Sequence, residues 1–330
     1  MQAPSHLVIP FAACLSDESQ KVFAGLKLPN LRALLAQLTQ STWDIGTQLD
    51  FSPPHERALA HIYSLNPPTI GNVDGQIPWG ALHARRAGLA GSSEGSTTAW
   101  AVITPCHWSL QTNHIVLPDP SLLQLQEDES RALLATMAPY FADDGITLLY
   151  ERSDRWLAQG EVFRNLATAS LDRAIGRNIH DWLPQTPEGK NLRRLQNEMQ
   201  MLLYTHPVND ARSSQRQDPV SAFWVSGTGA LPAQALPANL GDVCFAEGLR
   251  SAALHENWTR WGQAWQAMDA TLCATLRQTL TANKRVQFTL CGERSAVTLQ
   301  YADGRPWERV LPMLREKLGI FPAIYQHSLL

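Results

Sequence analysis

The segment NEMQMLLYTHPVNDARSSQRQDPVSAFWVSGTG, residues 197–229, joins two kinds of regular structure through a polar loop. Its first part continues a run in which leucine and methionine recur at helical spacing, so a helix is expected over residues 192–203. Pro207 stops or kinks that helix, because proline lacks the amide hydrogen that a helix interior uses. The apolar run SAFWVSG (221–227) then predicts a strand that closes on glycines. The segment therefore predicts a helix, a loop and a strand in succession.

The same alternation extends in both directions along the chain. Short apolar runs predict further strands at residues 6–13, 99–105, 146–152, 242–248 and 285–293. Amphipathic or proline-initiated segments predict helices within residues 29–38, 52–65 (after Pro53 and Pro54), 119–141, 257–280 and 305–319. Alternating strands and helices predict an α/β protein, with a central sheet flanked by helices.

The length and composition limit the class of protein. A chain of 330 residues is long enough for two domains, or for one domain that hosts an insertion. Its hydrophobic fraction of 44% and charged fraction of 17% are ordinary for a folded globular protein. The net charge is −3 and the lysines and arginines are scattered, so neither direct nucleic-acid binding nor attraction to an anionic membrane is expected. No apolar stretch approaches the roughly 18 residues of a membrane span.

The cysteines indicate a reducing compartment. There are five, an odd number, and they are widely spaced without any CxxC pair. This pattern disfavours both a disulfide framework and a zinc site. The N-terminal stretch has no basic region before its short apolar run, unlike a secretory signal peptide. A cytoplasmic location is therefore expected.

A tryptophan stripe marks the helix expected at residues 257–280. Trp258, Trp261 and Trp265 recur at helical spacing, and Met268 and Leu272 continue the same face. Such a stripe is either part of the core or a surface for a partner. We expect it to be mainly buried, fixing the long helix on the sheet.

Common catalytic motifs are absent from the sequence, including GxGxxG, the Walker loop, GxSxG and HExxH. His206, Asn209 and Arg212 lie close together after the helix at 192–203. A histidine beside a proline at a helix end is more often a capping or packing residue than a base, and Asn209 suits a turn or cap. His107 and His114 lack a nearby cysteine or acidic partner, so we interpret them as structural rather than metal-binding.

The order of these features resembles the archaeal-type cofactor-independent phosphoglycerate mutases, in the alkaline phosphatase superfamily. In that family a helix with Asn-Glu leads into His-Pro-Val-Asn, an arginine, a loop with proline and a strand closing on Gly-x-Gly. The corresponding residues here are Asn197, Glu198, His206 to Asn209, Arg212, Pro219, Gly227 and Gly229. Weaker similarity covers nearly the whole chain.

The resemblance implies an alkaline-phosphatase-like central sheet with a smaller inserted α+β domain. The core would comprise residues 1–105 and 186–330, and the insertion residues 106–185. It further implies that Asn197, His206, Asn209 and Arg212 belong to the scaffold. Enzymes of this family use a serine nucleophile and two divalent metals, which require several carboxylate and imidazole ligands.

The chain departs from the family at the catalytic positions. Where the first strand would end in a metal-binding aspartate and a glycine, this chain has Pro10 and Phe11. The position of the serine nucleophile falls at His55. A late Asp-His ligand pair falls at Glu293 and Arg294, and an arginine cannot ligate a cation. No metal and no cofactor are therefore expected.

The ligand segment before the long helix is degenerate as well. It reads LRSAALHENW, which leaves only His255 and Glu256 near the ligand register. The possible degenerate pocket thus comprises His55, Glu56, His255, Glu293 and Arg294.

Three functions follow from this set of residues. The favoured hypothesis is a catalytically inactive, mutase-like protein, a pseudoenzyme, that binds a protein partner or a small anionic ligand in a regulatory role. The alternative is an enzyme with a rebuilt, metal-independent pocket that acts on a phosphorylated or other anionic small molecule. A true mutase would need ligands that the sequence does not provide. Fold similarity alone does not choose among these functions.

Overall fold

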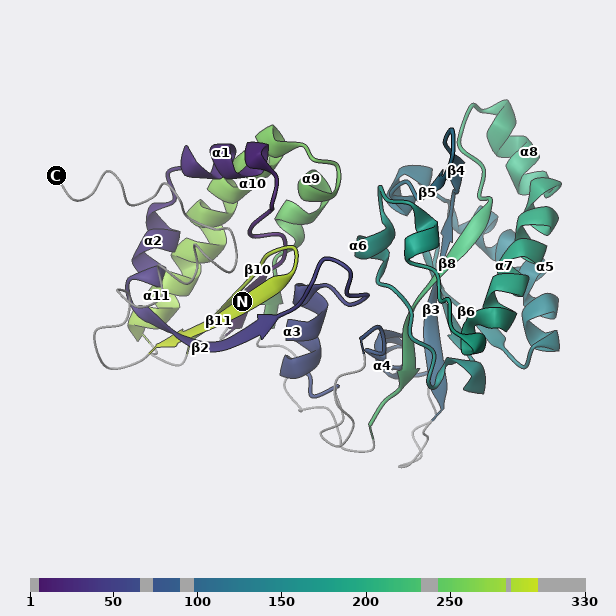
Figure 1. The fold of residues 1–330 in the computed structure, drawn as a ribbon, viewed down its shortest axis with the longest axis horizontal. Coiled ribbons are helices and arrows are strands. Elements are labelled where there is room, and N and C mark those ends of the chain that lie inside the picture. The colour runs from purple at the N-terminus through teal and green to yellow at the C-terminus, as the bar shows by residue number, and fades with distance from the viewer. Residues whose placement is uncertain (1–5, 66–73, 90–97, 233–242, 283–285, 302–330) are drawn as a thin grey trace. The chain divides into compact units, whose positions relative to one another are not determined.

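The computed structural model describes residues 6–65, 74–89, 98–232, 243–282 and 286–301 (Figure 1). The chain divides into two compact units. Unit 1 comprises residues 1–49, 53–63 and 237–330, and unit 2 comprises residues 50–52 and 64–236. Both combine sheets with flanking helices, so the expected mixed α/β class is confirmed.

Unit 1 is built on a five-stranded mixed sheet with the order β2-β11-β10-β1-β9. Its first strand lies inside the sheet and pairs in parallel with two strands from the end of the chain, β10 and β9. The strand β11 pairs antiparallel with both β10 and β2. The strands are β1 (His6–Ile9), β2 (Leu38–Ile45), β9 (Val243–Phe245), β10 (Gln287–Cys291) and β11 (Ser295–Tyr301).

Helices cover both faces of this sheet (Figure 1). One face packs against α1 (Asp17–Ala24), α2 (Pro29–Leu35), α10 (Trp258–Met268) and α11 (Ala274–Ala282), and α3 (Pro54–Ile62) lies against the other. Side chains alternate across a strand, so Leu7 and Ile9 enter the core on the first face. A short helix, α9 (Arg250–Leu254), and a 3-10 helix, Glu247–Leu249, precede α10.

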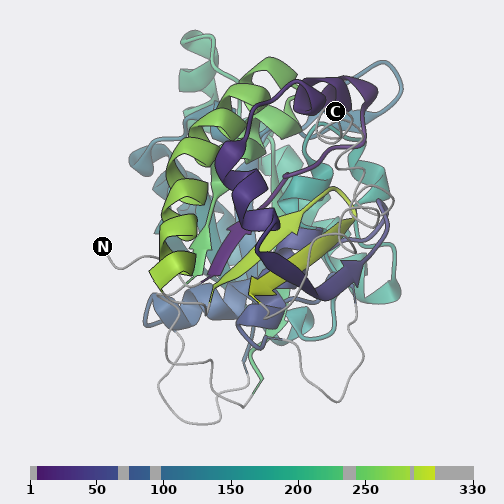
Figure 2. The ribbon, with the colours of Figure 1, turned by 90° about the vertical axis from the view of Figure 1, so that its left-hand side faces the viewer.

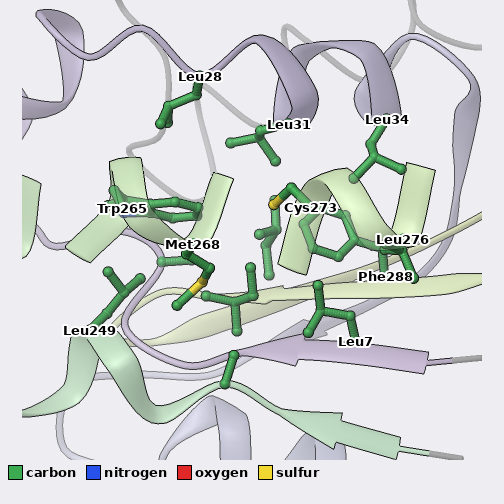
Figure 3. Packing of buried hydrophobic residues seen from close by; sticks show 14 of the residues in the cluster. Leu7, Leu28, Leu31, Leu34, Leu249, Trp265, Met268, Cys273, Leu276 and Phe288 are labelled. Carbon is green, nitrogen blue, oxygen red and sulfur yellow. The ribbon is translucent and has the colours of Figure 1, made fainter. Parts of the chain in front are cut away.

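The core of unit 1 gathers the apolar sides of these elements (Figure 3). Trp261 and Trp265 are each 1% exposed and Met268 is buried, while Trp258 is half-buried at the margin of the core. The prediction of a mainly buried tryptophan stripe is therefore confirmed. The tryptophan rings meet edge-on, at 89° for Trp261 and Trp265, a favourable geometry for aromatic pairs.

The long helix expected at 257–280 is present, with an irregular turn in its middle. A π-helical turn, Asp269–Cys273, joins α10 to α11. The Asp269 carboxylate accepts hydrogen bonds from the backbone amides of Leu31, at 2.7 Å, and Asn30, at 3.3 Å. These amides belong to the first turn of α2, which lies alongside the long helix (Figure 2). A side chain from another helix thus supplies the cap that α2 lacks locally.

Unit 2 contains a four-stranded antiparallel sheet with the order β6-β7-β3-β8. A separate hairpin pairs β4 with β5. The strands are β3 (Ala99–Cys106), β4 (Ser109–Leu110), β5 (Ile115–Val116), β6 (Thr147–Arg152), β7 (Arg155–Gln159) and β8 (Ala222–Ala230).

Two long helices cover one face of this sheet, and a short helix covers the other. The core on the first face combines α5 (Glu127–Asp143) and α7 (Lys190–Tyr204) with all four strands. On the second face α4 (Trp79–Arg86) packs on β8, β3 and β7. The remaining helices are α6 (Leu171–Ala174), α8 (Pro207–Ser214) and the 3-10 helices Pro120–Leu123, Glu161–Phe163, Ile179–Asp181 and Pro187–Gly189.

The glycines at the end of the segment 197–229 (the opening motif) allow α4 to approach the sheet. Gly227 has a φ of +63°, and a Cβ atom there would lie 2.7 Å from the Cβ of Trp79. Gly80, inside α4, is equally close to β3, where an added Cβ would lie 2.6 Å from the carbonyl carbon of Ala101. Helix and sheet thus meet at positions that only glycine fits.

Strand pairing sets the extent of unit 2. β3 pairs with β7 on one side and with β8 on the other, so residues 99–106 and 222–230 belong to the same sheet. Unit 2 therefore extends on both sides of residues 106–185, the range that the resemblance implied for an insertion. The helix expected at 305–319 lies outside the described residues. Within the described ranges, no helix is long and apolar enough to cross a membrane.

Candidate functional site

The turn after β1 occupies the position where the resemblance would place a metal-binding aspartate. Pro10 and Phe11 lie there, and Phe11 adopts a left-handed backbone conformation with φ of +54°. The Phe11 carbonyl accepts a hydrogen bond from the indole Nε1 of Trp261 at 3.0 Å. The next amide, that of Ala12, donates to the Cys291 carbonyl at 2.7 Å. The turn is thus fixed by the core helix and by β10.

His55, where the resemblance would place a serine nucleophile, is covered by aromatic rings. It is the second residue of α3, after Pro54 at the favoured first position. Its ring centroid lies 5.3 Å from that of Phe11 and 6.0 Å from that of Phe245. Only 4% of His55 is exposed. The imidazole is therefore a packed group in the wall of unit 1.

Glu293, where the resemblance would place a late metal ligand, accepts a hydrogen bond from the backbone after β1. Its Oε1 accepts from the amide of Leu15 at 2.9 Å, and its Oε2 accepts from Nε2 of Gln48 at 3.4 Å. The buried thiol of Cys14 lies nearby, and its pKa is raised by burial first and then by the carboxylates of Glu293 and Glu256. The carboxylates of Glu293 and Glu256 thus both lie close enough to the Cys14 thiol to raise its pKa.

Arg294, beside Glu293, has a fixed backbone and an exposed side chain. Its carbonyl accepts from Nη2 of Arg57 at 2.9 Å and from the amide of Gly46 at 3.0 Å. Arg57 in turn donates through Nε to the Asp44 carboxylate at 2.7 Å. These bonds join α3, the end of β2 and the turn between β10 and β11. They fix the Arg294 backbone, while the Arg294 side chain is exposed.

Of the two remaining candidates, Glu56 lies on the same helix as His55, and His255 lies on the surface. Glu56 is half-buried on α3 next to His55, and Arg57 of that helix contacts the Arg294 backbone. His255 is exposed just after α9, where its Nδ1 lies 2.7 Å from the Ser251 carbonyl. The structure thus brings α3 next to the turn that carries Glu293 and Arg294, and it places His255 on the surface.

Arg57 and Asp44 were not singled out in the sequence, although they join three elements of the site. Their ion pair links residues on a strand and a helix, and no local spacing signals it. They meet because α3 packs against β2 and its partner strand β11.

The donor set of this region does not fit a pair of divalent metals. Pro10 has no ligand atom on its side chain, Arg294 brings a positive charge, and the Glu293 carboxylate accepts a backbone hydrogen bond. Among the residues that the structure describes, no group of three or more histidine, cysteine, aspartate or glutamate side chains could hold a metal ion.

His206, in unit 2, begins a helix. Its Nδ1 accepts from the amide of Val208 at 3.2 Å, which makes it the N-cap of α8. Its Nε2 lies 2.9 Å from the Thr136 hydroxyl on α5. Burial lowers the pKa of His206 and the nearby Asp210 carboxylate opposes that shift. These contacts assign a structural role to His206.

Asn209 and Arg212 tie the same helix to the sheet. The Asn209 side chain exchanges hydrogen bonds with the backbone of Val220, each at 2.8 Å, and donates to the Leu203 carbonyl. Arg212 is 1% exposed and donates to the Glu129 carboxylate and to two backbone carbonyls. Asn197, by contrast, is exposed on α7.

No protein-family model and no curated protein matches the chain. Among solved structures, the chain is similar to a cofactor-independent phosphoglycerate mutase from Thermoplasma acidophilum DSM 1728. The two share 14% identity over 92% of this chain and 91% of that chain, with a TM-score of 0.37. The chain is also similar to the PH0037 protein from Pyrococcus horikoshii, with 10% identity, coverage of 97% and 98%, and a TM-score of 0.46. Likeness at this level assigns no activity or site to this chain.

Proposed function

We propose that the protein is a catalytically inactive, mutase-like protein that binds an anionic small molecule or a protein partner in a regulatory role. The observation that carries the proposal is the environment of His55. This residue stands where the resemblance would place the nucleophile, is 4% exposed and packs against two phenylalanine rings. A nucleophile must reach within roughly 3–3.5 Å of the reacting atom, and a covered ring cannot do so.

The polar groups of α3, the end of β2 and the turn after β10 support the same function. The Glu293 carboxylate accepts hydrogen bonds from Leu15 and Gln48, and Arg57 is paired with Asp44. Groups held in this way fix the local backbone. A carboxylate that acted as a general base would instead need an oxygen within hydrogen-bond reach of the substrate.

The Arg294 guanidinium is the group that we propose for recognition. Two hydrogen bonds hold its carbonyl while its side chain reaches solvent. Exposed apolar side chains belong to the segment that pairs with this turn: Ile45, 63% exposed, is paired directly with Ser295, and Leu49, 80% exposed, follows four residues later. A guanidinium beside apolar groups suits a phosphate or carboxylate that carries an apolar body, or an acidic segment of a partner.

Two assays on the purified protein test this function. We expect no interconversion of 2- and 3-phosphoglycerate, with or without Mn²⁺. We also expect 3-phosphoglycerate, used as an anionic probe in calorimetry, to bind more weakly to Arg294→Ala than to the wild type. Arg260→Ala is the matched control, because Arg260 is exposed on α10 in the same unit.

Turnover would show that the assignment is wrong. Turnover without metal that is lost in His55→Ala would instead establish an enzyme with a rebuilt, metal-independent pocket. Binding of the probe that Arg294→Ala leaves unchanged would remove Arg294 from the recognition site.

A further inference from the structure

Unit 2 contains a cavity that the proposed function does not use. Its volume is about 510 Å³, within the range of roughly 300–1,000 Å³ that is usual for small-molecule sites. The β4–β5 hairpin, the segment after α6 and the helix α7 form its walls. The lining residues are Trp108, Asn113, His114, Ile115, Asn178, Ile179, His180, Leu183, Asn197 and Gln200.

The walls of the cavity are fixed by backbone and side-chain hydrogen bonds. A bridge joins Val116, at the end of β5, to Asn178. The Asn178 side chain accepts from the amide of His180 at 3.2 Å, which caps the 3-10 helix Ile179–Asp181. On the other wall, the amide of Trp108 donates to the Ser221 hydroxyl at 2.9 Å. A site with walls held in this way loses little conformational entropy when it binds a ligand.

The lining combines polar and apolar side chains and carries no Asp, Glu, Lys or Arg side chain. It contains four carboxamides, two imidazoles and one indole. Each carboxamide offers a donor and an acceptor, which match hydroxyl groups that also donate and accept. Trp108 and Ile115 provide apolar surface for the C–H face of a ring. The absence of fixed charge in this lining disfavours an ionised ligand, because its charge would be left unpaired.

Asn197 connects this cavity to the opening motif of the sequence. Its fellow motif residues His206, Asn209 and Arg212 bond within the fold, whereas Asn197 lies at the cavity. Gln200 follows one helical turn later, and Tyr204, 85% exposed, continues the same side of α7. The helix therefore presents two carboxamides and an exposed aromatic ring along one stripe.

We propose that this cavity of unit 2 binds a small neutral carbohydrate. The carboxamides of Asn113, Asn178, Asn197 and Gln200 bond the hydroxyl groups, and Trp108 packs against the sugar ring. The proposal needs only residues of unit 2, and it does not depend on the anion-binding role of Arg294 in unit 1.

The test uses the full chain and a panel of neutral sugars: glucose, galactose, mannose, N-acetylglucosamine, maltose and trehalose. Saturation-transfer NMR detects binding, and calorimetry measures Kd. We expect at least one sugar to bind, and Asn197→Leu and Gln200→Leu each to weaken it by about tenfold, the effect of losing one or two hydrogen bonds. Gln263→Leu, on the exposed side of α10 in unit 1, is the control and leaves Kd within about twofold.

Circular dichroism and urea unfolding show whether each variant is folded. Because Asn197→Leu and Gln200→Leu are tested separately, the proposal can still be tested if one of them fails to fold. The proposal is overturned if no neutral sugar of the panel binds the wild type. It is also overturned if folded Asn197→Leu and Gln200→Leu bind as the wild type does, or if glucose 6-phosphate binds while glucose does not.

Discussion

Arg212 donates two hydrogen bonds to the Glu129 carboxylate, at 2.9 and 3.1 Å, although 83 positions separate the two residues in the chain. Glu129 also closes the capping box of α5, where its Oε2 accepts from the amide of Gln126 at 2.9 Å. Arg212 donates further to the carbonyls of Leu123 and Asp218. One buried guanidinium thus joins the start of α5, the end of α8 and the approach to β8.

Removal of this guanidinium should destabilise unit 2 strongly. We expect Arg212→Ala to lower the free energy of unfolding by about 3–5 kcal/mol, because it leaves a carboxylate and two carbonyls without their partner. Urea unfolding measures the change. Arg131→Ala is the control, since Arg131 forms an exposed ion pair with Glu127 on the same helix and should cost less than about 1 kcal/mol. Equal effects of the two variants would contradict the structural role of Arg212.

Trp261→Ala should lower the free energy of unfolding by about 3–5 kcal/mol, the range for truncation of a core tryptophan. The residue is 1% exposed, contacts Phe23 and Trp265, and donates to the Phe11 carbonyl. Chemical denaturation followed by circular dichroism measures the loss. A change below about 1 kcal/mol would show that the stripe does not hold the core together.

Gly227→Ala should be more harmful than a substitution at an equally left-handed but open position. The change imposes a positive φ on a residue with a side chain, which costs roughly 1–2 kcal/mol, and places a Cβ 2.7 Å from that of Trp79. Gly145→Ala isolates the first effect, because Gly145 has a φ of +71° and nothing lies within 4 Å of an added Cβ. Thermal unfolding of the two variants compares them, and equal melting temperatures would disprove close packing of α4.

Stability should fall as the pH falls below about 6.5, partly because of His6. Burial lowers the pKa of His6 to about 4, and its Nε2 lies 2.7 Å from the Thr289 hydroxyl. At pH values between about 4 and 6.5, His6 binds a proton in the unfolded chain but not in the folded chain, because its pKa is near 6.5 when unfolded and near 4 when folded. The loss over this window is on the order of 3 kcal/mol.

His6→Asn should remove that part of the pH dependence. Urea midpoints at pH 7 and pH 4.5 measure it, with exposed His61→Gln as the control. His83, whose pKa is lowered to about 4 by burial and then by Arg155, adds a loss of the same sign in unit 2. The comparison of His6→Asn with the wild type, rather than the slope alone, therefore isolates His6. An unchanged slope in the variant would rule His6 out.

Titration with Mn²⁺ or Zn²⁺ should show no pair of tight sites in unit 1. A cation held about 4 Å from the Arg294 guanidinium would meet a repulsion of roughly 4 kcal/mol at an effective dielectric constant of 20, a loss of several decades in affinity. Isothermal calorimetry on the chelator-treated protein checks this. Sub-micromolar binding of two ions per chain, abolished by Glu293→Gln, would mean that the donor set has been misjudged.

The elements that could be predicted from the sequence are those with a strong apolar pattern. Buried strands such as β1, β3 and β10, and the helices α7 and α10, contain continuous or helically spaced apolar residues. The strand β2 was not predicted, because LTQSTWDI is largely polar and pairs along one side only, with β11. An edge strand buries too little to show a clear alternation.

The site was less predictable than the fold, because its contacts join distant segments. The spacing of His206 and Asn209 near a proline was enough to indicate a cap and a turn, and both bond to nearby backbone. The ring of Phe11 over His55 and the bond from Leu15 to Glu293 depend on how β1, α3 and β10 meet. These are tertiary contacts, and local sequence spacing does not indicate them.

The position of β1 inside its sheet has a consequence during synthesis. Both strands that flank β1, β9 and β10, lie beyond residue 242, whereas nearly all of unit 2 is contiguous in sequence. Domains generally fold as units while the ribosome extends the chain. Unit 2 can therefore fold first, while the apolar strand His6–Ile9 lacks both partner strands until the residues beyond 242 have been synthesised. During that interval the nascent chain exposes an apolar, unpaired strand. A chaperone would have to cover this strand to prevent aggregation.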